Sequence, residues 1–269
     1  MVYRFTEEKS EDRGVFNMTI DDALHIPESE RKKVVAGYLE HEREARAKGI
    51  PMLGSGKVFQ VTEESIMCEA FTPPDHWSWI WGLDFGLDHP FAAVLLVWDK
   101  DADVIYVVHC IRMKNAMPLQ HCAATKPLLG GRGWKVPAAW PQDGHQRKEF
   151  DGKLEPLAKI YKTHGMKMLK EHAQFSDGSN STEAGIMEMQ ERMRSNRFKV
   201  FKHNTEWFDE FRMYHRKDGE LVKVKDDLMS GTRVGVMAKR HAKAVMYVER
   251  ALGSANVPVA KDVDPDDLW

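Results

Sequence analysis

The sequence is poor in cysteine, has no long apolar run and carries almost no net charge. Its three cysteines, Cys68, Cys110 and Cys122, are odd in number and lack a CxxC spacing. This argues against a disulfide framework or a zinc ribbon and fits a reducing cytoplasm. The longest apolar runs, 79–83 and 91–98, are too short to cross a bilayer, and the charged first ten residues are unlike a secretion signal. With a formal net charge of −2, any binding to nucleic acid would have to come from local basic patches.

The chain is predicted to contain a lead-in segment, one main domain and a tail. Residues 1–71 are polar and include one expected helix over 29–49. The pair Pro73–Pro74 precedes dense apolar patterning, so we place the main domain at 72–252. A hydrophobic content of 42% is enough for such a domain to bury a core. The tail, 253–269, is acidic and expected to be disordered.

The patterning of the main domain predicts an α/β architecture. Three β-like runs separated by short polar links predict an antiparallel meander over 78–85, 91–98 and 104–112. Helices and strands then alternate, with helices expected near 117–129, 153–163, 181–194 and Trp207, and strands at 136–140, 166–169 and 198–201. Asp218–Gly219 predicts a tight hairpin, and a long helix is expected from about residue 226 to 251. This is the order of the RNase H-like fold, a central mixed β-sheet flanked by helices, with an added β-hairpin before the C-terminal helix.

Acidic residues lie at the ends of predicted strands and at the start of the last helix. Asp84 lies in the apolar run WIWGLDFG, where an ionised carboxylate without a partner is costly to bury. Asp143 follows the apolar run VPAAW, and Asp226 and Asp227 precede the last helix. Hard oxygen ligands from separate segments suit Mg²⁺ or Mn²⁺ better than zinc. Each acid taken alone also fits a turn or a helix N-cap, so the ordered set is what indicates a metal site.

Several motifs, in this order, resemble the nuclease half of the large terminase subunits of tailed phages. The resemblance covers roughly residues 30–250 and rests on the strings GLDFGLDHPFAAVLLVWD, VPAAWPQDG, FSDGSNSTEAGIMEM and FKVFKHNTEWFDEFRMYHRKDGELVKVKDDLMSGTR. It implies a metal-dependent endonuclease that cuts concatemeric viral double-stranded DNA during genome packaging. Two divalent metal ions, Mg²⁺ or Mn²⁺, are the implied cofactors.

The same resemblance identifies candidate catalytic and metal-binding residues. Asp84 corresponds to the family's first-strand aspartate and Asp143 to the acid after the fourth strand. The pair Asp226–Asp227 corresponds to the third acid, and within it we favour Asp227. Asp88 is a candidate outer ligand or ligand of the second metal, although the string DHP also fits a turn.

Partners and location follow from the resemblance alone. The implied partners are double-stranded DNA, the portal protein, the small terminase subunit and an ATPase motor domain, in the cytoplasm of the infected bacterial host. The segment 40–59 resembles the junction between motor and nuclease, which makes residues 1–71 a linker. The string GSGK lacks the glycine and hydroxyl residues of a phosphate loop, because Pro51 and Val58 stand at those positions, so no ATPase activity is expected. The alternatives are a RuvC-like junction-resolving or repair endonuclease and a non-enzymatic docking module of the packaging complex.

Basic residues near the acidic pair are candidates for DNA contact. They are Arg216, Lys217, Lys223 and Lys225 on or beside the hairpin, and Arg233, Lys239 and Arg240 on the last helix. The hairpin leads directly into Asp226–Asp227, so its cations would lie where backbone phosphates pass. The alternative is an ordinary solvated charged face.

Other metal-ligating residue types are expected in the core. His109–Cys110 lies on a predicted strand, where neighbouring side chains face opposite sides, so at most one of the two could join a zinc site. We expect His121–Cys122 to pack in the core as well, together with Met187, Met189 and Met193 of the predicted amphipathic helix.

Overall fold

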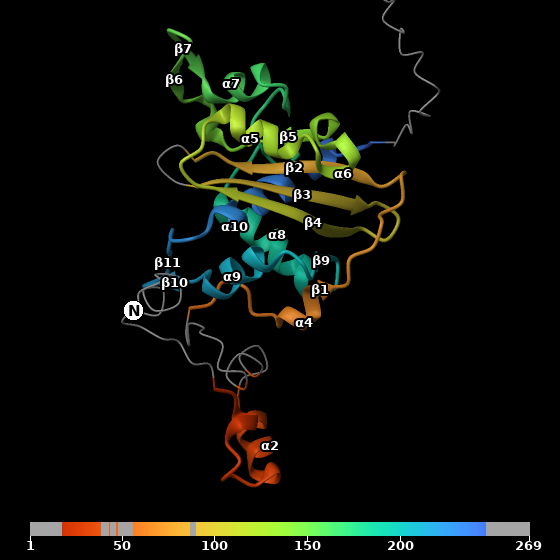
Figure 1. Cartoon of the computed structure of the whole chain (residues 1–269), viewed down its shortest axis with the longest axis vertical. Coiled ribbons are helices and arrows are strands. Elements are labelled where there is room, and N and C mark those ends of the chain that lie inside the picture. The colour runs from red at the N-terminus through yellow and green to blue at the C-terminus, as the bar shows by residue number, and fades with distance from the viewer. Residues whose placement is uncertain (1–17, 39–42, 44–46, 48–55, 87–89, 246–269) are drawn as a thin grey trace, which may run out of the picture.

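The computed structural model describes residues 18–38, 43, 47, 56–86 and 90–245. Within these residues, an eight-stranded mixed sheet has the order β1-β9-β4-β3-β2-β5-β8, and β12 pairs with β2 (Figure 1). The strands of this sheet are β1 Met67–Cys68, β2 Ser78–Asp84, β3 Phe91–Asp99, β4 Val104–Met113, β5 Pro137–Ala139, β8 Lys167–Met168, β9 Phe198–Phe201 and β12 Lys243–Ala244. Two hairpins lie outside it, formed by β6 Arg147–Phe150 with β7 Lys153–Pro156, and by β10 Arg216–Lys217 with β11 Glu220–Leu221.

The helices connect these strands and cover both faces of the sheet. They are α2 Glu28–Ala36, α4 Glu63–Ile66, α5 Pro118–Thr125, α6 Leu128–Gly131, α7 Leu157–Thr163, α8 Thr182–Arg194, α9 Thr205–Met213 and α10 Asp227–Met237. Short 3-10 turns occupy Ile20–Asp22, Gly133–Lys135, Gln142–His145 and Lys239–His241. No helix among the described residues is long and apolar enough to cross a membrane.

The expected antiparallel meander is confirmed. β2 pairs antiparallel with β3, and β3 with β4. β5, β8 and β9 pair parallel with their neighbours, as strands joined through helices do. Both faces of the central strands are buried under helices, which explains why these strands read as continuous apolar runs.

Alternating residues of the sheet contribute to two separate cores. Ile80 and Val94 pack with α8, α9 and α10 on one face, whereas Trp81 and Leu83 pack with α5 and α7 on the other. Because successive side chains of a strand point to opposite faces, Asp84 shares the face of Ile80 and therefore faces α10.

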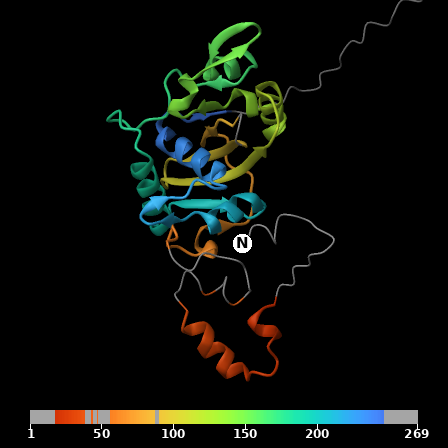
Figure 2. The same ribbon diagram turned by 90° about the vertical axis from the view of Figure 1, so that its left-hand side faces the viewer.

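Helix α10 lies unusually close to β2, in front of the central strands in Figure 2. A Cβ atom at Gly82 would collide with the backbone of Gly231 and Gly235. Glycine on both sides of the contact thus lets the helix backbone rest on the strand. As a result, the N-terminus of α10 comes next to the end of β2.

The last helix is shorter than expected. α10 ends at Met237, a 3-10 turn follows, and Lys243–Ala244 pair antiparallel with Ser78 and Trp79 of β2. The prediction of one helix to residue 251 was therefore wrong, because pairing with the start of β2 satisfies backbone groups of both segments. Residues 246–269, which include the predicted tail, lie outside the described residues.

The packed core begins before the expected boundary at residue 72. Val58, Phe59 and Ile66 are buried in the α8–α10 core, and β1 pairs with β9 at the edge of the main sheet. These apolar residues lie in a polar segment, which is why composition alone assigned them to the lead-in. The division of the chain into lead-in, nuclease domain and tail stays a prediction.

The β6–β7 hairpin was not expected, since 153–163 was predicted to be helical throughout. Figures 1 and 2 both show it at the end of the molecule, beyond β5. Asp151 and Gly152 both have positive φ and form its turn, a signal that is present in the string FDGK.

Candidate active site

Four of the predicted acids line one cavity of about 750 Å³ at the carboxyl end of β2. They are Asp84, Asp143, Asp226 and Asp227, and they come from three separate segments of the chain. The fifth candidate, Asp88, lies outside the described residues. The sequence-based expectation that these acids gather in one place is therefore met for the four that can be located.

Asp84 is the last residue of β2 and lies at the centre of this acidic group. The pKa of Asp84 is raised to about 8, first by burial and then by the nearby charges of Asp143, Asp227 and Asp226. Arg233 of α10 lines the same cavity and opposes the shift. The cations that line the cavity therefore do not offset the effect of burial and of the neighbouring carboxylates on Asp84.

Asp143 lies in the 3-10 turn Gln142–His145, directly after β5. The turn packs tightly, since a Cβ atom at Gly144 would collide with the rings of Trp140 and Phe85. Burial raises the pKa of Asp143, partly offset by backbone N–H groups. Its Oδ1 atom is buried, and no hydrogen-bond partner for it exists within the described part of the chain. A buried carboxylate oxygen without a donor is an open position for a cation.

Asp227 and Asp226 lie at the N-terminus of α10 and differ in their surroundings. Asp227 is buried, and Arg112 of β4 donates to its Oδ2 atom from Nε at 2.9 Å and lies 2.8 Å from it through Nη2. Asp226 precedes the helix, and its pKa is raised by burial and by the charge of Asp227. The helix N-terminus favours a negative charge at both positions.

The carboxylates are gathered but not yet arranged as a ligand sphere. Across the described ranges, no three His, Cys, Asp or Glu side chains are placed so that they could hold a metal ion together as they stand. One physical reason for this arrangement is that the Asp227 carboxylate is paired with Arg112. Mutual repulsion among carboxylates is another, because like charges separate when no cation lies between them.

Two residues next to the acids, Arg112 and Glu210, were missed by the sequence analysis. Arg112 pairs in register with Ala92, which pairs with Asp84, so the three lie in one line across β4, β3 and β2. Glu210 of α9 is buried, and its Oε2 atom accepts hydrogen bonds from the backbone N–H groups of Leu228 and Met229. An arginine near the end of an apolar strand was the available signal for the first. No local signal pointed to the second.

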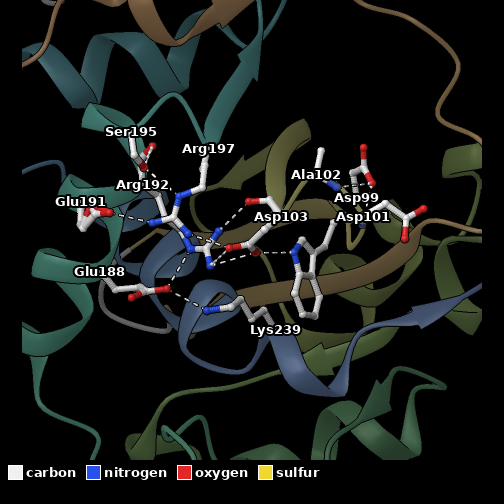
Figure 3. Close-up of polar contacts among 11 residues, drawn as sticks. Asp99, Asp101, Ala102, Asp103, Glu188, Glu191, Arg192, Ser195, Arg197 and Lys239 are labelled. Carbon is white, nitrogen blue, oxygen red and sulfur yellow. Dashed lines mark hydrogen bonds and ion pairs between the residues drawn. The ribbon is translucent and has the colours of Figure 1, made fainter.

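The predicted DNA-contacting cations fall into two groups. Lys223, Lys225 and Arg233 line the acidic cavity, and Lys217 is exposed on the hairpin. The other three lie outside the cavity lining and contact protein groups: Arg216 donates to Glu183 at 2.9 Å, Lys239 to Glu188 at 2.7 Å (Figure 3), and Arg240 to the carbonyl oxygen of Gln174. As DNA contacts, all seven stay predictions.

The expectation that His121 and Cys122 pack in the core is confirmed. His121 stacks on Phe91, and its Nδ1 atom lies 2.8 Å from the hydroxyl of Tyr161. Burial lowers the pKa of His121 to about 4, so the ring is neutral at physiological pH. Cys122 is buried beside them.

Comparison with known proteins relates the chain to phage large terminase subunits. It is 43% identical over 251 residues to the large terminase subunit of Salmonella phage P22, covering 93% of this chain and 49% of that protein. The identity to the large terminase subunit of Enterobacteria phage LP7 is 44% over 247 residues, covering 91% and 51%. The chain thus spans about half the length of these curated relatives.

Solved structures show the same relationship. The P22 large terminase nuclease domain matches with a TM-score of 0.64 and 42% identity, over 71% of this chain and 96% of that one. The large terminase of a thermophilic bacteriophage is 14% identical with a TM-score of 0.54, over 81% and 54%, and shows the fold alone. The family model described as Terminase RNaseH-like domain matches residues 81–239. The expected RNase H-like fold is therefore confirmed, and the chain belongs to the terminase RNaseH-like domain family.

Proposed function

We propose that this chain is a metal-dependent endonuclease that cuts concatemeric viral double-stranded DNA during genome packaging. The observation that carries the proposal is the convergence of Asp84, Asp143, Asp226 and Asp227 on one cavity. The pKa values of Asp84, Asp143 and Asp226 are raised mainly by burial, and carboxylates with raised pKa values in a cavity are typical of a functional site. Membership of the terminase family and the match to a nuclease domain support the choice of reaction.

The residues present fit a pair of divalent cations. All donors are carboxylate oxygens, which suit Mg²⁺ or Mn²⁺, and the buried Oδ1 atom of Asp143 is an open donor. We assign Asp84, Asp143 and Asp227 as the main ligands, with Asp226 secondary and Asp88 as an outer candidate. When bound, the cations supply Lewis-acid catalysis of phosphodiester hydrolysis.

The remaining charged residues around the cavity hold the substrate and balance the acids. Lys223 and Lys225 line the cavity and can bind backbone phosphates on either side of the cleaved bond. Arg233 lies among the carboxylates and offsets part of their charge. Contacts of this kind to phosphates carry no base information, so we expect cleavage with little sequence preference.

The wider biological setting follows from the relatives. Because they are about twice as long as this chain, we propose that the activity operates together with an ATPase motor domain, a small terminase subunit and a portal protein. The proposed site of action is the cytoplasm of the infected bacterial host.

Cleavage of supercoiled plasmid by the purified chain tests the proposal. We expect nicked and linear products with Mn²⁺ or Mg²⁺ and none in EDTA. Asp84→Asn and Asp143→Asn should be inactive, whereas Asp177→Asn, which changes an exposed carboxylate outside the cavity, should cut like the wild type. Cleavage that persists in chelator, or survives both cavity substitutions, would overturn the proposal.

A further inference from the structure

Arg112 forms one wall of the acidic cavity and contacts only one oxygen of Asp227. Its Nε and Nη2 atoms lie 2.9 and 2.8 Å from Oδ2 of Asp227. Neither of these contacts involves Oδ1. The Asp227 side chain is 11% exposed and that of Arg112 is 17% exposed, so solvent screens the pair only weakly.

Glu210 lies beside both Arg112 and the start of α10. Its side chain is 4% exposed, and its Oε1 atom lies 3.2 Å from Nε of Arg112, the atom that donates to Asp227, in an ionic contact without a hydrogen bond. Its Oε2 atom accepts from the backbone N–H groups of Leu228 at 2.7 Å and Met229 at 3.3 Å. Glu210 therefore anchors the first turn of the helix that carries Asp227 and lies in ionic contact with the guanidinium that holds the Asp227 carboxylate.

We propose that Arg112, braced by Glu210, is a positioning residue that holds the Asp227 carboxylate by Oδ2 and leaves Oδ1 for a divalent cation. The inference rests on the proposed function. A carboxylate on a short side chain has two rotatable bonds, and in a group of like charges it would otherwise turn away from Asp84. An outer partner that fixes a ligand's orientation typically contributes a factor of about 10–100 in metal affinity.

Arg112 should affect cation affinity in two opposite ways: its positive charge should weaken cation binding, whereas its orientation of the Asp227 carboxylate should strengthen it. This makes the proposal testable. Removing the positive charge of Arg112 would strengthen cation binding by simple electrostatics. Replacing it with lysine keeps the charge but loses the planar guanidinium whose Nε and Nη2 atoms both contact Oδ2 of Asp227. Similarly, Glu210→Asp keeps the carboxyl group but shortens the side chain that reaches Arg112 and the helix N-terminus.

The decisive measurement is Mn²⁺ affinity of the whole chain by isothermal titration calorimetry, for Arg112→Lys, Glu210→Asp and the control Arg212→Lys. Arg212 is a matched control, because its Nε and Nη2 atoms donate to the two carboxylate oxygens of Glu63 at 2.6 and 2.8 Å. It lies on α9, the helix of Glu210, but outside the cavity. We expect Arg112→Lys to bind Mn²⁺ about 10–100-fold more weakly and Glu210→Asp to be weakened in the same direction. The control should stay within about twofold of the wild type.

Thermal unfolding separates positioning from stability. If Arg112→Lys and Glu210→Asp lose stability but keep wild-type Mn²⁺ affinity, the role is structural and the inference is wrong. If Arg112→Lys does not fold, the affinity of Glu210→Asp decides by the same criterion. Failure of the wild type itself to bind Mn²⁺ would instead overturn the proposed function.

Discussion

Two clusters of charged residues in this protein differ in how completely their carboxylates are paired with cations and hydrogen-bond donors. In the first, at the β3–β4 turn and the end of α8, Asp103 accepts hydrogen bonds from Arg192 and Arg197, while Glu188 binds Arg192 and Lys239 (Figure 3). Burial opposes ionisation of Asp103, but hydrogen bonds from Trp98, Arg197 and Arg192 keep its pKa lowered. This cluster needs no further ion.

The carboxylates of the acidic cavity are paired less completely. There, the pKa of Asp84 rises to about 8, although Arg112, Lys223, Lys225 and Arg233 line the cavity together with the four acids. Burial and the neighbouring carboxylates therefore disfavour ionisation of Asp84 when no further cation is bound. The comparison supports the proposal that the cavity binds a cation, whereas hydrogen bonds already stabilise the carboxylates of the first cluster.

Removing one acid from each cluster should affect catalysis very differently. We expect Asp84→Ala to lower the cleavage rate by about 10³-fold or more, because Asp84 is one of the main proposed ligands of the cations. Asp143→Ala and Asp227→Ala should behave alike, and Asp226→Ala should be affected less. Asp103→Ala should keep wild-type activity at a temperature where it is folded. A fully active Asp227→Ala with an inactive Asp226→Ala would reverse our assignment within the pair.

The free energy of unfolding should depend on the first cluster more than on the cavity, the reverse of the order expected for catalysis. Arg192 is 4% exposed and contacts both Asp103 and Glu188, so we expect Arg192→Ala to lower the free energy of unfolding by about 2 kcal/mol through the loss of these charged hydrogen bonds. Asp84→Ala should be neutral or stabilising in EDTA, since it relieves repulsion. Denaturant unfolding in EDTA measures both. Strong destabilisation by Asp84→Ala would mean that its carboxylate is a structural group.

The free energy of unfolding in EDTA should depend on pH in opposite directions for the two clusters. The folded-state pKa values of Asp84 and Glu210 are raised to about 8, so the folded state binds more protons than the unfolded state between about pH 4 and 8. Stability is then greatest below the unfolded pKa and falls as pH rises toward 8, by about 1.4 kcal/mol per pH unit at most for each group. Asp84→Asn should flatten this slope. Asp103 has a lowered pKa, so its contribution is instead lost as pH falls.

The smallest effect is expected on DNA affinity when two cations of the hairpin are neutralised. Lys217 is exposed on the hairpin, while Arg216 is paired with Glu183. We expect the double variant Arg216→Gln/Lys217→Gln to bind unrelated sequences more weakly and to reduce the slope of log affinity against log salt by about one. Lys202→Gln, which changes a cation paired with Glu69 outside the seven candidates, should leave the slope unchanged. An unaltered slope in the hairpin variant would assign these cations to solvent.

The sequence predicted those parts of the fold that depend on local patterns. Continuous apolar runs separated by polar turns predicted β2, β3 and β4, and the Asp218–Gly219 turn predicted the β10–β11 hairpin, where both residues have positive φ. The prediction of the end of α10 failed because that end depends on pairing with β2. The prediction that Met187 is buried was wrong for a local reason: Met187 is 68% exposed because it lies off the helix face that buries Met189 and Met193.

The convergence of the acids was predictable, but the residues that contact them were not. Asp84 ends β2, Asp143 follows β5 and Asp227 begins α10, and the topology brings these positions together. Arg112 reaches the cavity through the register of three strands, and Glu210 through the packing of α9 against α10. Neither relation exists in the linear sequence. Ion pairs such as Lys239 with Glu188, 51 residues apart, are hidden for the same reason.

The central claim is that the four carboxylates of the cavity form a divalent cation site. Anomalous diffraction from crystals grown with Mn²⁺ tests it most directly. We predict two anomalous peaks about 4 Å apart, bounded by Asp84, Asp143 and Asp227. Peaks only elsewhere on the molecule, with the cavity empty at saturating Mn²⁺, would contradict the account.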